Sequence, residues 1–336
     1  MLKFMAAASV LCLLGCGLVR PSWGQSVDVH LTPRQAAVAH AEATLGADGI
    51  ADPALRMDSK PLHKDVDLVL VPVTITDPMN RLVAGLEKES FLVRENGQPQ
   101  TIRSSSSEDA PISLGVIFDI SASMADKIDE SRQAVLEFFR TANPEDEFFV
   151  VTFSDRPEVL MDFTSSVEDI QRRLAYAIPK GCTSLLDAIY LGIDHMREAR
   201  YERKALLIIS DGGDNRSRYT EGELMDRVRE ADVQIYAMGL FNFQGKTAEE
   251  LHGPELLGAI TGATGGQTFF IRSPRDLPEV AAKIGIELRN QYLLAYHPTN
   301  PTHDGKWRKI KVKVNPPQGL PPLHVYAKTG YYAAAE

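Results

Sequence analysis

Residues 114–117 and 206–209 are two runs without a polar side chain, and each is followed within two positions by an aspartate, Asp119 or Asp211. A strand that is apolar on both sides must be covered on both faces, as the central strands of a parallel sheet are. Between residues 113 and 289, strand-like and helical patterns alternate along the chain. Because parallel strands need crossover connections, which are usually helices, this alternation predicts an α/β domain with a doubly wound, mostly parallel sheet.

The hydrophobic periodicity also gives the expected elements of this domain. Helical patterns predict helices over residues 128–140, 167–177, 185–200, 221–230, 254–261 and 277–289. Short apolar runs predict strands over residues 113–118, 147–153, 205–210, 233–238 and 267–271. We therefore place the α/β domain at residues 111–290.

Strand patterns without intervening helices flank this domain on both sides. The expected strands cover residues 66–76, 91–95, 100–103, 292–296, 307–314 and 324–328. Asn96 and Gly97 form a strong hairpin signal, and residues 104–109 are expected to be a polar connector. We predict that residues 65–108 and 291–336 pair into one small β-sandwich-like domain, into which the α/β domain is inserted or by which it is flanked.

The net charge argues against a nucleic-acid partner. The formal net charge is -9 at pH 7, whereas binding to phosphates requires a basic surface. The nearest candidate for such a surface is Lys309, Lys311 and Lys313, which alternate with apolar residues. This alternation is typical of a strand with one solvated face, so we expect no nucleic-acid binding.

The first 24 residues have the pattern of an export signal. Lys3 precedes an apolar run over residues 4–19, which is shorter than the about 20 residues that span a membrane, and Gly24 suits cleavage by signal peptidase. We expect a signal peptide over residues 1–24 and an exported protein, either periplasmic or extracellular. In the alternative, residues 13–16 form a lipobox and Cys16 is lipidated, and only then do we expect contact with a membrane.

Residues 25–64 are expected to contain a short helix and a linker. Thr32 is a typical N-cap for a helix over residues 34–45, and the Gly-, Asp- and Pro-containing residues 46–64 have a linker composition. Cys182 is the only cysteine after the predicted signal peptide, which excludes an intrachain disulfide. We expect Cys182 to pack as a small apolar side chain rather than to act as a redox group.

Side chains with oxygen atoms gather where the two central strands end. Asp119 is followed by Ser121 and Ser123, Asp211 follows the second apolar strand, and Thr183 lies in the loop before an expected helix. Ligands of an open parallel sheet bind beyond the carboxyl ends of its strands, where such loops converge. Two carboxylates and three hydroxyls, without sulfur or imidazole, favour Mg²⁺ over zinc, with Mn²⁺ or Ca²⁺ as alternatives.

Segments 119–123, 181–189 and 205–214, in this order, resemble the metal-ion-dependent adhesion site of von Willebrand factor A domains. The similarity covers residues 111–290. More widely, residues 63–336 resemble a group of secreted bacterial proteins, notably acidobacterial ones, with a related domain.

The resemblance implies a metal-dependent, adhesion-type binding module. The implied ligands of the ion are Asp119, Ser121, Ser123, Thr183 and Asp211, with the aspartates binding directly or through water. An Asp or Glu carboxylate of a partner protein completes the shell. Asp187 is implied to support the Thr183 loop through hydrogen bonds, and Asp214 is either a further carboxylate near the ion or without a role.

Simpler roles remain open for several of these residues. In one alternative, Ser121 and Ser123 cap the next helix and residues 211–214 form only a turn. Asp126 lies either at an adjacent second metal site or, together with Asp129, in a capping arrangement for the next helix, and we expect the capping.

The sequence offers little support for enzymatic chemistry. Residues 239–247 nearly match a phosphate-binding loop, but five residues separate the glycines where the motif requires four. The sequence has no GxSxG elbow and no HExxH pattern, so a hydrolase is the least favoured alternative. We therefore expect a binding protein that is not an enzyme and binds no nucleotide; the alternative is an envelope structural or assembly protein with a structural ion.

Mass spectrometry of the exported chain tests the prediction for the N-terminus. We expect the mature chain to begin at Gln25, because a small residue, Gly24, precedes the cleavage position. A mature chain that begins at a lipidated Cys16 would contradict this prediction and establish the lipid anchor instead.

Overall fold

The computed structural model describes residues 68–107, 109–211, 213–241, 248–316, 319 and 321–335. The predicted signal peptide, Cys16, the helix over residues 34–45 and the linker over residues 46–64 lie outside the described residues. Within the described part of the chain, no helix has both the length and the apolar character that a membrane span requires.

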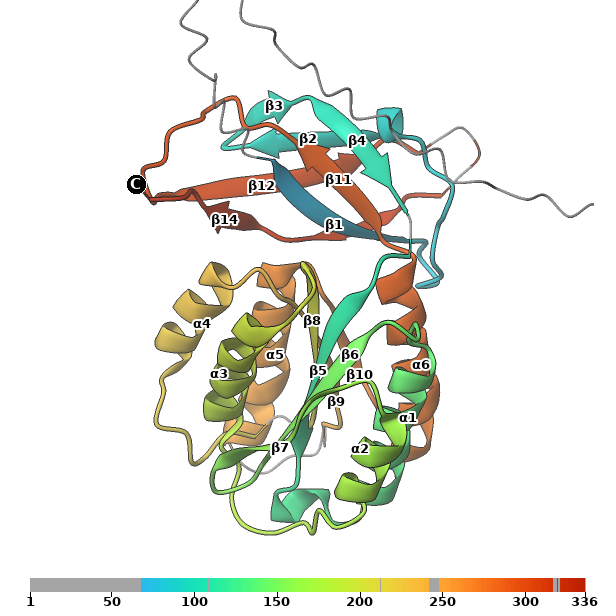
Figure 1. The fold of residues 1–336 in the computed structure, drawn as a ribbon, viewed down its shortest axis with the longest axis vertical. Helices are drawn as coiled ribbons and strands as arrows, with labels where there is room; N and C mark the ends of the chain where they lie inside the picture. The colour runs from blue at the N-terminus through green and yellow to red at the C-terminus, as the bar shows by residue number, and fades with distance from the viewer. Residues whose placement is uncertain are drawn as a thin grey trace, which may run out of the picture. The chain divides into compact units, whose positions relative to one another are not determined.

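Strand β5 (Ile112–Asp119) is buried at every position and lies inside a six-stranded sheet with the order β10-β9-β8-β5-β6-β7 (Figure 1). Its two neighbours, β6 (Glu147–Phe153) and β8 (Arg203–Ser210), run parallel to it. Strands β9 (Gln234–Gly239) and β10 (Thr268–Phe270) continue the parallel arrangement. The prediction of a mostly parallel α/β sheet is therefore confirmed.

The remaining strand, β7 (Pro157–Thr164), runs antiparallel to β6 at the edge of the sheet. The sequence pattern does not predict it. All of its side chains are partly or fully exposed, so it lacks the continuous apolar run that marks a strand buried on both faces.

Side chains from two neighbouring strands approach β5 closely at Gly115. A Cβ atom at this position would lie 2.4 Å from Cδ2 of Leu206 and 2.4 Å from Cζ of Phe149. A residue larger than glycine therefore requires these packed side chains to move, and packed cores resist such shifts.

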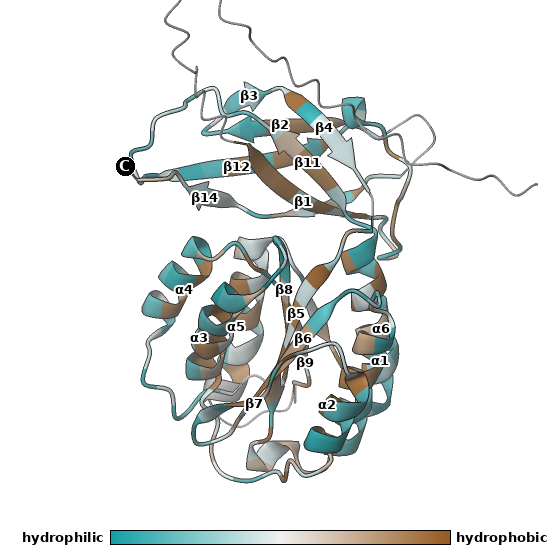
Figure 2. Cartoon of the chain, in the orientation of Figure 1, coloured by the Kyte–Doolittle hydropathy of each residue, from teal (hydrophilic) through white to brown (hydrophobic). Residues whose placement is uncertain are grey.

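Helices cover both faces of the sheet (Figure 1). One face is covered by α1 (Ile128–Arg140), α2 (Val167–Leu174) and α6 (Leu277–Arg289), and the other by α3 (Leu185–His195), α4 (Glu221–Glu230) and α5 (Ala248–Thr264). The bounds of α1, α4 and α6 are those predicted, whereas α3 ends earlier and continues as a 3-10 turn over Met196–Glu198. Helix α5 begins before Pro254, which lies inside it. Figure 2 shows hydrophilic residues along the outer sides of α1 and α2.

Two four-stranded antiparallel sheets form the second part of the described chain, with the orders β13-β1-β11-β4 and β14-β12-β2-β3. Their strands are β1 (Val69–Thr76), β2 (Phe91–Glu95), β3 (Gln98–Gln100), β4 (Ile102–Ser106), β11 (Tyr292–Tyr296), β12 (Trp307–Val314), β13 (His324–Ala327) and β14 (Gly330–Tyr332). Apolar side chains from both sheets, including Val71, Leu294 and Ile310, form a common core. Because β1 pairs with β11 and β13, the prediction that the two flanking segments pair with each other is confirmed.

One detail of this β part agrees with the prediction, and two differ. Asn96 and Gly97 form the expected turn between β2 and β3, with φ values of 47° and 86°, as a two-residue hairpin requires. The strand expected over residues 100–103 is divided, because β3 and β4 belong to different sheets. Residues 104–106, expected in a connector, pair with β11. Backbone groups form this pairing, so an exposed edge strand can consist of serines.

The β part contacts the α/β part at the amino ends of the parallel strands. The Gln291 side-chain amide donates to Thr74 Oγ1 at 3.0 Å and to Gln234 Oε1 at 2.8 Å, and all three residues are buried. Lys328 Nζ lies 2.9 Å from Asp232 Oδ1. These contacts lie at the opposite end of the strands from Asp119.

One buried carboxyl group near this end of the sheet is incompletely satisfied. Glu287 on α6 accepts a hydrogen bond at Oε2 from Gln267 Nε2 at 3.4 Å, and Lys283 Nζ lies 3.9 Å from Oε1. Oε1 has no hydrogen-bond partner among the described residues. Burial raises the pKa of Glu287 to about 7, although the positive charge of Lys283 lowers it.

We expect the substitution Glu287→Gln to remove a pH-dependent loss of stability. The pKa of Glu287 is higher in the folded protein than its ordinary value of 4.5, so the wild-type protein loses stability as the pH rises from about 4.5 through about 7. The variant should exceed wild type in free energy of unfolding by on the order of 2 kcal/mol at about pH 8, and by much less at about pH 5. Chemical denaturation at both pH values measures this difference. The exposed Glu279 on the same helix provides the control Glu279→Gln, and an equal gain at both pH values would contradict the prediction.

Candidate metal centre

Asp119, the last residue of β5, has a fully buried carboxylate that joins the two central strands. Its Oδ1 accepts a hydrogen bond from the backbone N–H of Ser121 at 2.8 Å. Its Oδ2 accepts one from the hydroxyl of Ser210, the last residue of β8, at 2.6 Å. These two bonds fix the orientation of the carboxylate at the carboxyl edge of the sheet.

Ser121 and Ser123 lie in the turn that follows Asp119. Their hydroxyl oxygens are 3.0 Å apart. Helix α1 begins only after this turn, with Lys127 as its N-cap residue and without a side-chain capping bond. The alternative in which the two serines cap this helix is therefore wrong.

The predicted capping arrangement of Asp126 and Asp129 is also wrong. Because Lys127 is the N-cap residue, Asp126 lies one position before the cap, and the N-cap side chain makes no capping bond to α1. The carboxylate of Asp129 instead pairs with Arg132 Nη1 at 2.6 Å.

Backbone hydrogen bonds connect the Thr183 loop to the other two loops. The N–H of Ala122 donates to the carbonyl of Gly181 at 3.2 Å. The N–H of Thr183 donates to Asn215 Oδ1 at 2.9 Å, and the carbonyl of Thr183 accepts from the N–H of Asn215 at 3.0 Å. Thr183 is buried, and these bonds hold its backbone between the loops that follow β5 and β8.

Asp211 follows β8 and faces the same edge as Asp119. Its Oδ2 lies 3.4 Å from Nζ of Lys127, and the same ammonium donates to the carbonyl of Ser123 at 3.2 Å. Burial raises the pKa of Asp119 to about 7, and the negative charge of Asp211 raises it further, against the hydrogen bonds from Ser121 and Ser210. Two carboxylates at a buried edge therefore need positive charge beside them.

Asp214 and Asp187 connect the loop after β8 to helix α3. Asp214 Oδ1 accepts from the N–H of Leu185 at 2.8 Å and from the hydroxyl of Ser217 at 2.6 Å, so Asp214 satisfies the first turn of α3 from outside the helix. Asp187 Oδ1 accepts from the N–H of Arg218 at 2.8 Å. Both carboxylates thus hold the loop that contains Asn215 against the helix that follows Thr183.

The spacing of residues does not reveal the roles of Asn215, Ser210 and Lys127. Each of the three acts across the sheet edge on a residue that is distant in the sequence, as the bonds of Asn215 to Thr183 and of Ser210 to Asp119 show. Only their position next to Thr183, Asp119 and Asp211 in space identifies them.

Cys182 lies in the loop that precedes Thr183. Cys182 is exposed, and its N–H donates to Asp155 Oδ1 at 3.0 Å. The prediction that Cys182 packs as an apolar side chain is therefore wrong, because its loop lies at the open edge of the sheet, where no core covers it. Of the loop resembling a phosphate-binding motif, residues 242–247 lie outside the described residues.

The residues at this edge fit a hard divalent cation. The side chains of Asp119, Asp211, Ser121, Ser123 and Thr183 offer only oxygen atoms. Mg²⁺, Mn²⁺ and Ca²⁺ prefer oxygen ligands. Burial and the negative charge of Asp211 raise the pKa of Asp119, so a cation beside it would stabilise its ionised form. The oxygen ligands and the negative charge at this edge therefore both favour a divalent cation.

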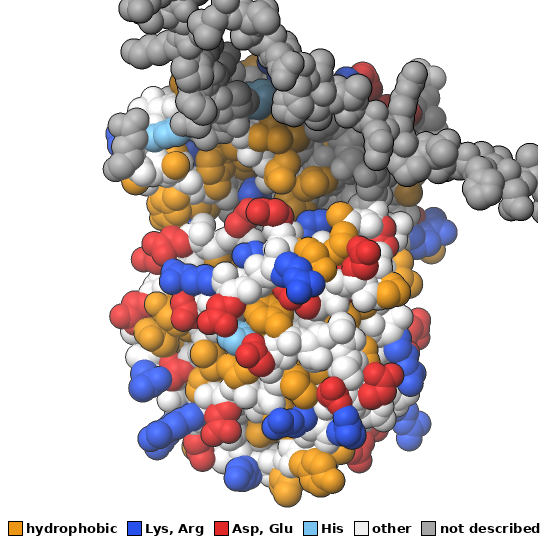
Figure 3. All heavy atoms as spheres, viewed as in Figure 1, with side chains coloured by type: hydrophobic (Ala, Val, Ile, Leu, Met, Phe, Trp, Pro, Cys, Tyr) orange, Lys and Arg blue, Asp and Glu red, His pale blue; other side chains and the backbone are white. Residues whose placement is uncertain are grey.

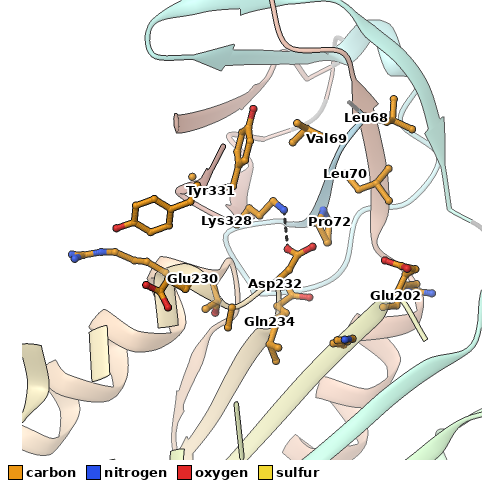
Figure 4. Close-up of a pocket in the computed structure, with 18 of the residues that line it drawn as sticks. Leu68, Val69, Leu70, Pro72, Glu202, Glu230, Asp232, Gln234, Lys328 and Tyr331 are labelled. Carbon is orange, nitrogen blue, oxygen red and sulfur yellow. Dashed lines mark hydrogen bonds and ion pairs between the residues drawn. The ribbon is translucent and has the colours of Figure 1, made fainter. Parts of the chain in front are cut away.

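A separate cavity of about 710 Å³ lies at the other end of the strands. Figure 4 shows Leu70 and Pro72 of β1 on one side of it and Asp232 and Gln234 on the other, with Lys328 paired to Asp232. Its lining includes residues at the start of β5, β8 and β9, so it does not include the candidate metal centre.

The charge distribution agrees with the absence of a nucleic-acid footprint in the sequence. On the face shown in Figure 3, basic and acidic side chains of the α/β part are interspersed. Lys309, Lys311 and Lys313 are exposed on β12, whereas Ile310 is buried, which confirms the predicted strand alternation.

The described chain thus contains a doubly wound α/β domain with oxygen-bearing side chains at the carboxyl edge of its sheet. Residues 115–213 match the family model described as von Willebrand factor type A domain. This part of the chain is therefore similar to von Willebrand factor type A domains.

Solved structures with similar folds come from several organisms. A von Willebrand factor type A protein from Catenulispora acidiphila matches with 13% identity and a TM-score of 0.48, over 79% of this chain and 75% of that chain. An aerotolerance-related membrane protein from Bacteroides fragilis matches with 14% identity and a TM-score of 0.43, over 53% and 98%. Proximal thread matrix protein 1 from the mussel byssus, in a structure with a zinc-occupied MIDAS motif, matches with 19% identity and a TM-score of 0.45, over 58% and 50%. No curated protein matches the sequence, and we draw no conclusion about ligands or partners from these likenesses.

We expect Asp214→Ala to destabilise the protein by about 1–2 kcal/mol, because the variant leaves N–H groups in the first turn of α3 without an acceptor. Urea denaturation measures the loss. Asp226 on α4, whose side chain is 72% exposed, provides the control Asp226→Ala, which should change stability by less than about 0.5 kcal/mol. Equal losses in both variants would contradict the capping role of Asp214.

Proposed function

We propose that the protein is a metal-dependent, adhesion-type binding module. Its ion is Mg²⁺, with Mn²⁺ or Ca²⁺ as alternatives, held by Asp119, Ser121, Ser123, Thr183 and Asp211. The observation that carries the proposal is the network of hydrogen bonds that joins the three loops with these residues at one edge of the sheet.

The roles of the individual residues follow from their contacts. Ser121 and Ser210 hold the carboxylate of Asp119, and Asn215 holds the backbone of Thr183 on both its N–H and its carbonyl. When bound, Mg²⁺ keeps exchangeable coordination positions, and an Asp or Glu carboxylate of a partner protein can take one of them. The hydroxyl ligands add no negative charge, which favours an anionic group from the partner.

We infer that this edge binds and does not catalyse. A hydrolase would need a base beside Ser121. Among the described histidines, His195 pairs with Asp162 and His252 pairs with Glu221, at 3.0 and 2.9 Å. The absence of a GxSxG elbow in the sequence agrees with this inference.

We also propose that the protein acts outside the cytoplasm, in the periplasm or at the outer surface of a bacterial envelope. The export pattern of residues 1–24 supports this location. Lipidation at Cys16 would attach the same module to a membrane surface.

Titration calorimetry with MgCl₂ tests the metal centre. We expect the wild-type protein to bind Mg²⁺, Asp119→Ala to lose binding, and Ser123→Ala, which changes an exposed residue, to weaken binding about tenfold or more without unfolding. Asp226→Asn, which removes the same charge far from the centre, should bind as wild type does. Equal heats for wild type and Asp119→Ala would contradict the proposal.

A second measurement distinguishes a binding module from a structural protein with a structural ion. Thr183→Val removes the hydroxyl and keeps the shape of the side chain. Capture of envelope proteins that depends on Mg²⁺ and is lost in folded Thr183→Val supports the binding module, whereas unfolding of this variant together with Mg²⁺-independent capture by wild type supports the structural role.

A further inference from the structure

Lys127 lies between two loops that contain proposed ligands of the ion. Its Nζ is 3.2 Å from the carbonyl oxygen of Ser123 and 3.4 Å from Oδ2 of Asp211. The Lys127 side chain is 20% exposed and that of Asp211 is 14% exposed. The ammonium group thus spans from the turn after β5 to the loop after β8.

This ion pair differs from an ordinary surface pair in its surroundings. Exposed pairs are screened by water and salt and contribute little, whereas both groups here are mostly buried. The neighbouring carboxylate of Asp119 is fully buried and adds negative charge beside Asp211. Lys127 therefore stabilises the carboxylate of Asp211 when no other cation is beside it.

A divalent cation and the Lys127 ammonium compete for the carboxylate of Asp211. Both need an oxygen atom of the same carboxylate, and positive charges a few ångströms apart repel each other strongly at a mostly buried site. Binding of a divalent cation through Asp211 therefore has to displace the ammonium or weaken its ion pair.

We propose that Lys127 is a built-in competitor for Asp211 that lowers the affinity of the centre for divalent cations and stabilises the cation-free protein. The inference rests on the proposed metal centre. It adds a residue that is not a ligand but sets the cation concentration at which the centre fills.

Two lysine-to-methionine variants test the competition. Lys127→Met removes the ammonium and keeps an unbranched side chain at the N-cap position. Lys180→Met is the matched control, because Lys180 is exposed in the adjoining loop, and its backbone N–H, which bonds to the Ile120 carbonyl, is unchanged by the substitution. Both variants lose one positive charge near the centre, but only Lys127 contacts a proposed ligand.

Calorimetry with MgCl₂ and thermal unfolding in a chelator give two independent measurements. We expect Lys127→Met to bind Mg²⁺ about threefold to tenfold more tightly than wild type, because no ion pair has to be broken. The same variant should unfold at a lower temperature than wild type in the chelator, and this difference should shrink in saturating MgCl₂. Lys180→Met should change the affinity much less.

Unchanged or weaker binding by Lys127→Met, or an equal gain in Lys180→Met, would overturn the competition. If the wild-type protein binds no Mg²⁺ within the accessible range, binding by Lys127→Met still supports the proposal. Failure of both proteins to bind overturns it together with the metal centre. If wild type binds Mg²⁺ and Lys127→Met binds no more tightly, the metal centre is supported and only the competition is overturned.

Discussion

The buried carboxylate of Asp119 is the group on which the arrangement of the candidate metal centre depends. An ionised carboxylate without partners is costly to bury, and here the N–H of Ser121 and the hydroxyl of Ser210 accommodate its two oxygens. The Ser121 bond is local, whereas the Ser210 bond requires β5 and β8 to be adjacent and parallel, with their carboxyl ends level. The alignment of the two central strands therefore fixes the position of the carboxylate, and the loops that follow them begin from that point.

The loops are positioned mainly by bonds between side chains and backbone. Asn215 binds the backbone of Thr183, Asp214 binds the first turn of α3, and Asp187 binds the N–H of Arg218. Such bonds do not depend on an ion, so the protein can hold its proposed ligands in place before a cation arrives. This prior ordering reduces the conformational entropy that cation binding has to overcome.

The candidate metal centre and the β part lie at opposite ends of the parallel strands. Gln291 and Lys328 connect the β part to the amino ends of the strands, whereas Asp119 and Asp211 follow the carboxyl ends. The carboxyl edge is therefore not involved in the contacts described between the two parts. A module that binds a partner through this edge would benefit from that separation, because the connection to the β part need not change on binding.

The sequence by itself determined the alternation of strands and helices, the central position of β5 and β8, the hairpin at Asn96, and the convergence of oxygen side chains beyond Asp119 and Asp211. These features depend on local periodicity and on the rule that parallel strands end at one edge, both of which can be read along the chain. The tertiary structure alone decided the antiparallel edge strand β7 and the pairing of residues 104–106, because backbone hydrogen bonds form them without an apolar pattern. It also decided the roles of Ser210, Asn215 and Lys127, since these depend on contacts between residues that are far apart in the sequence.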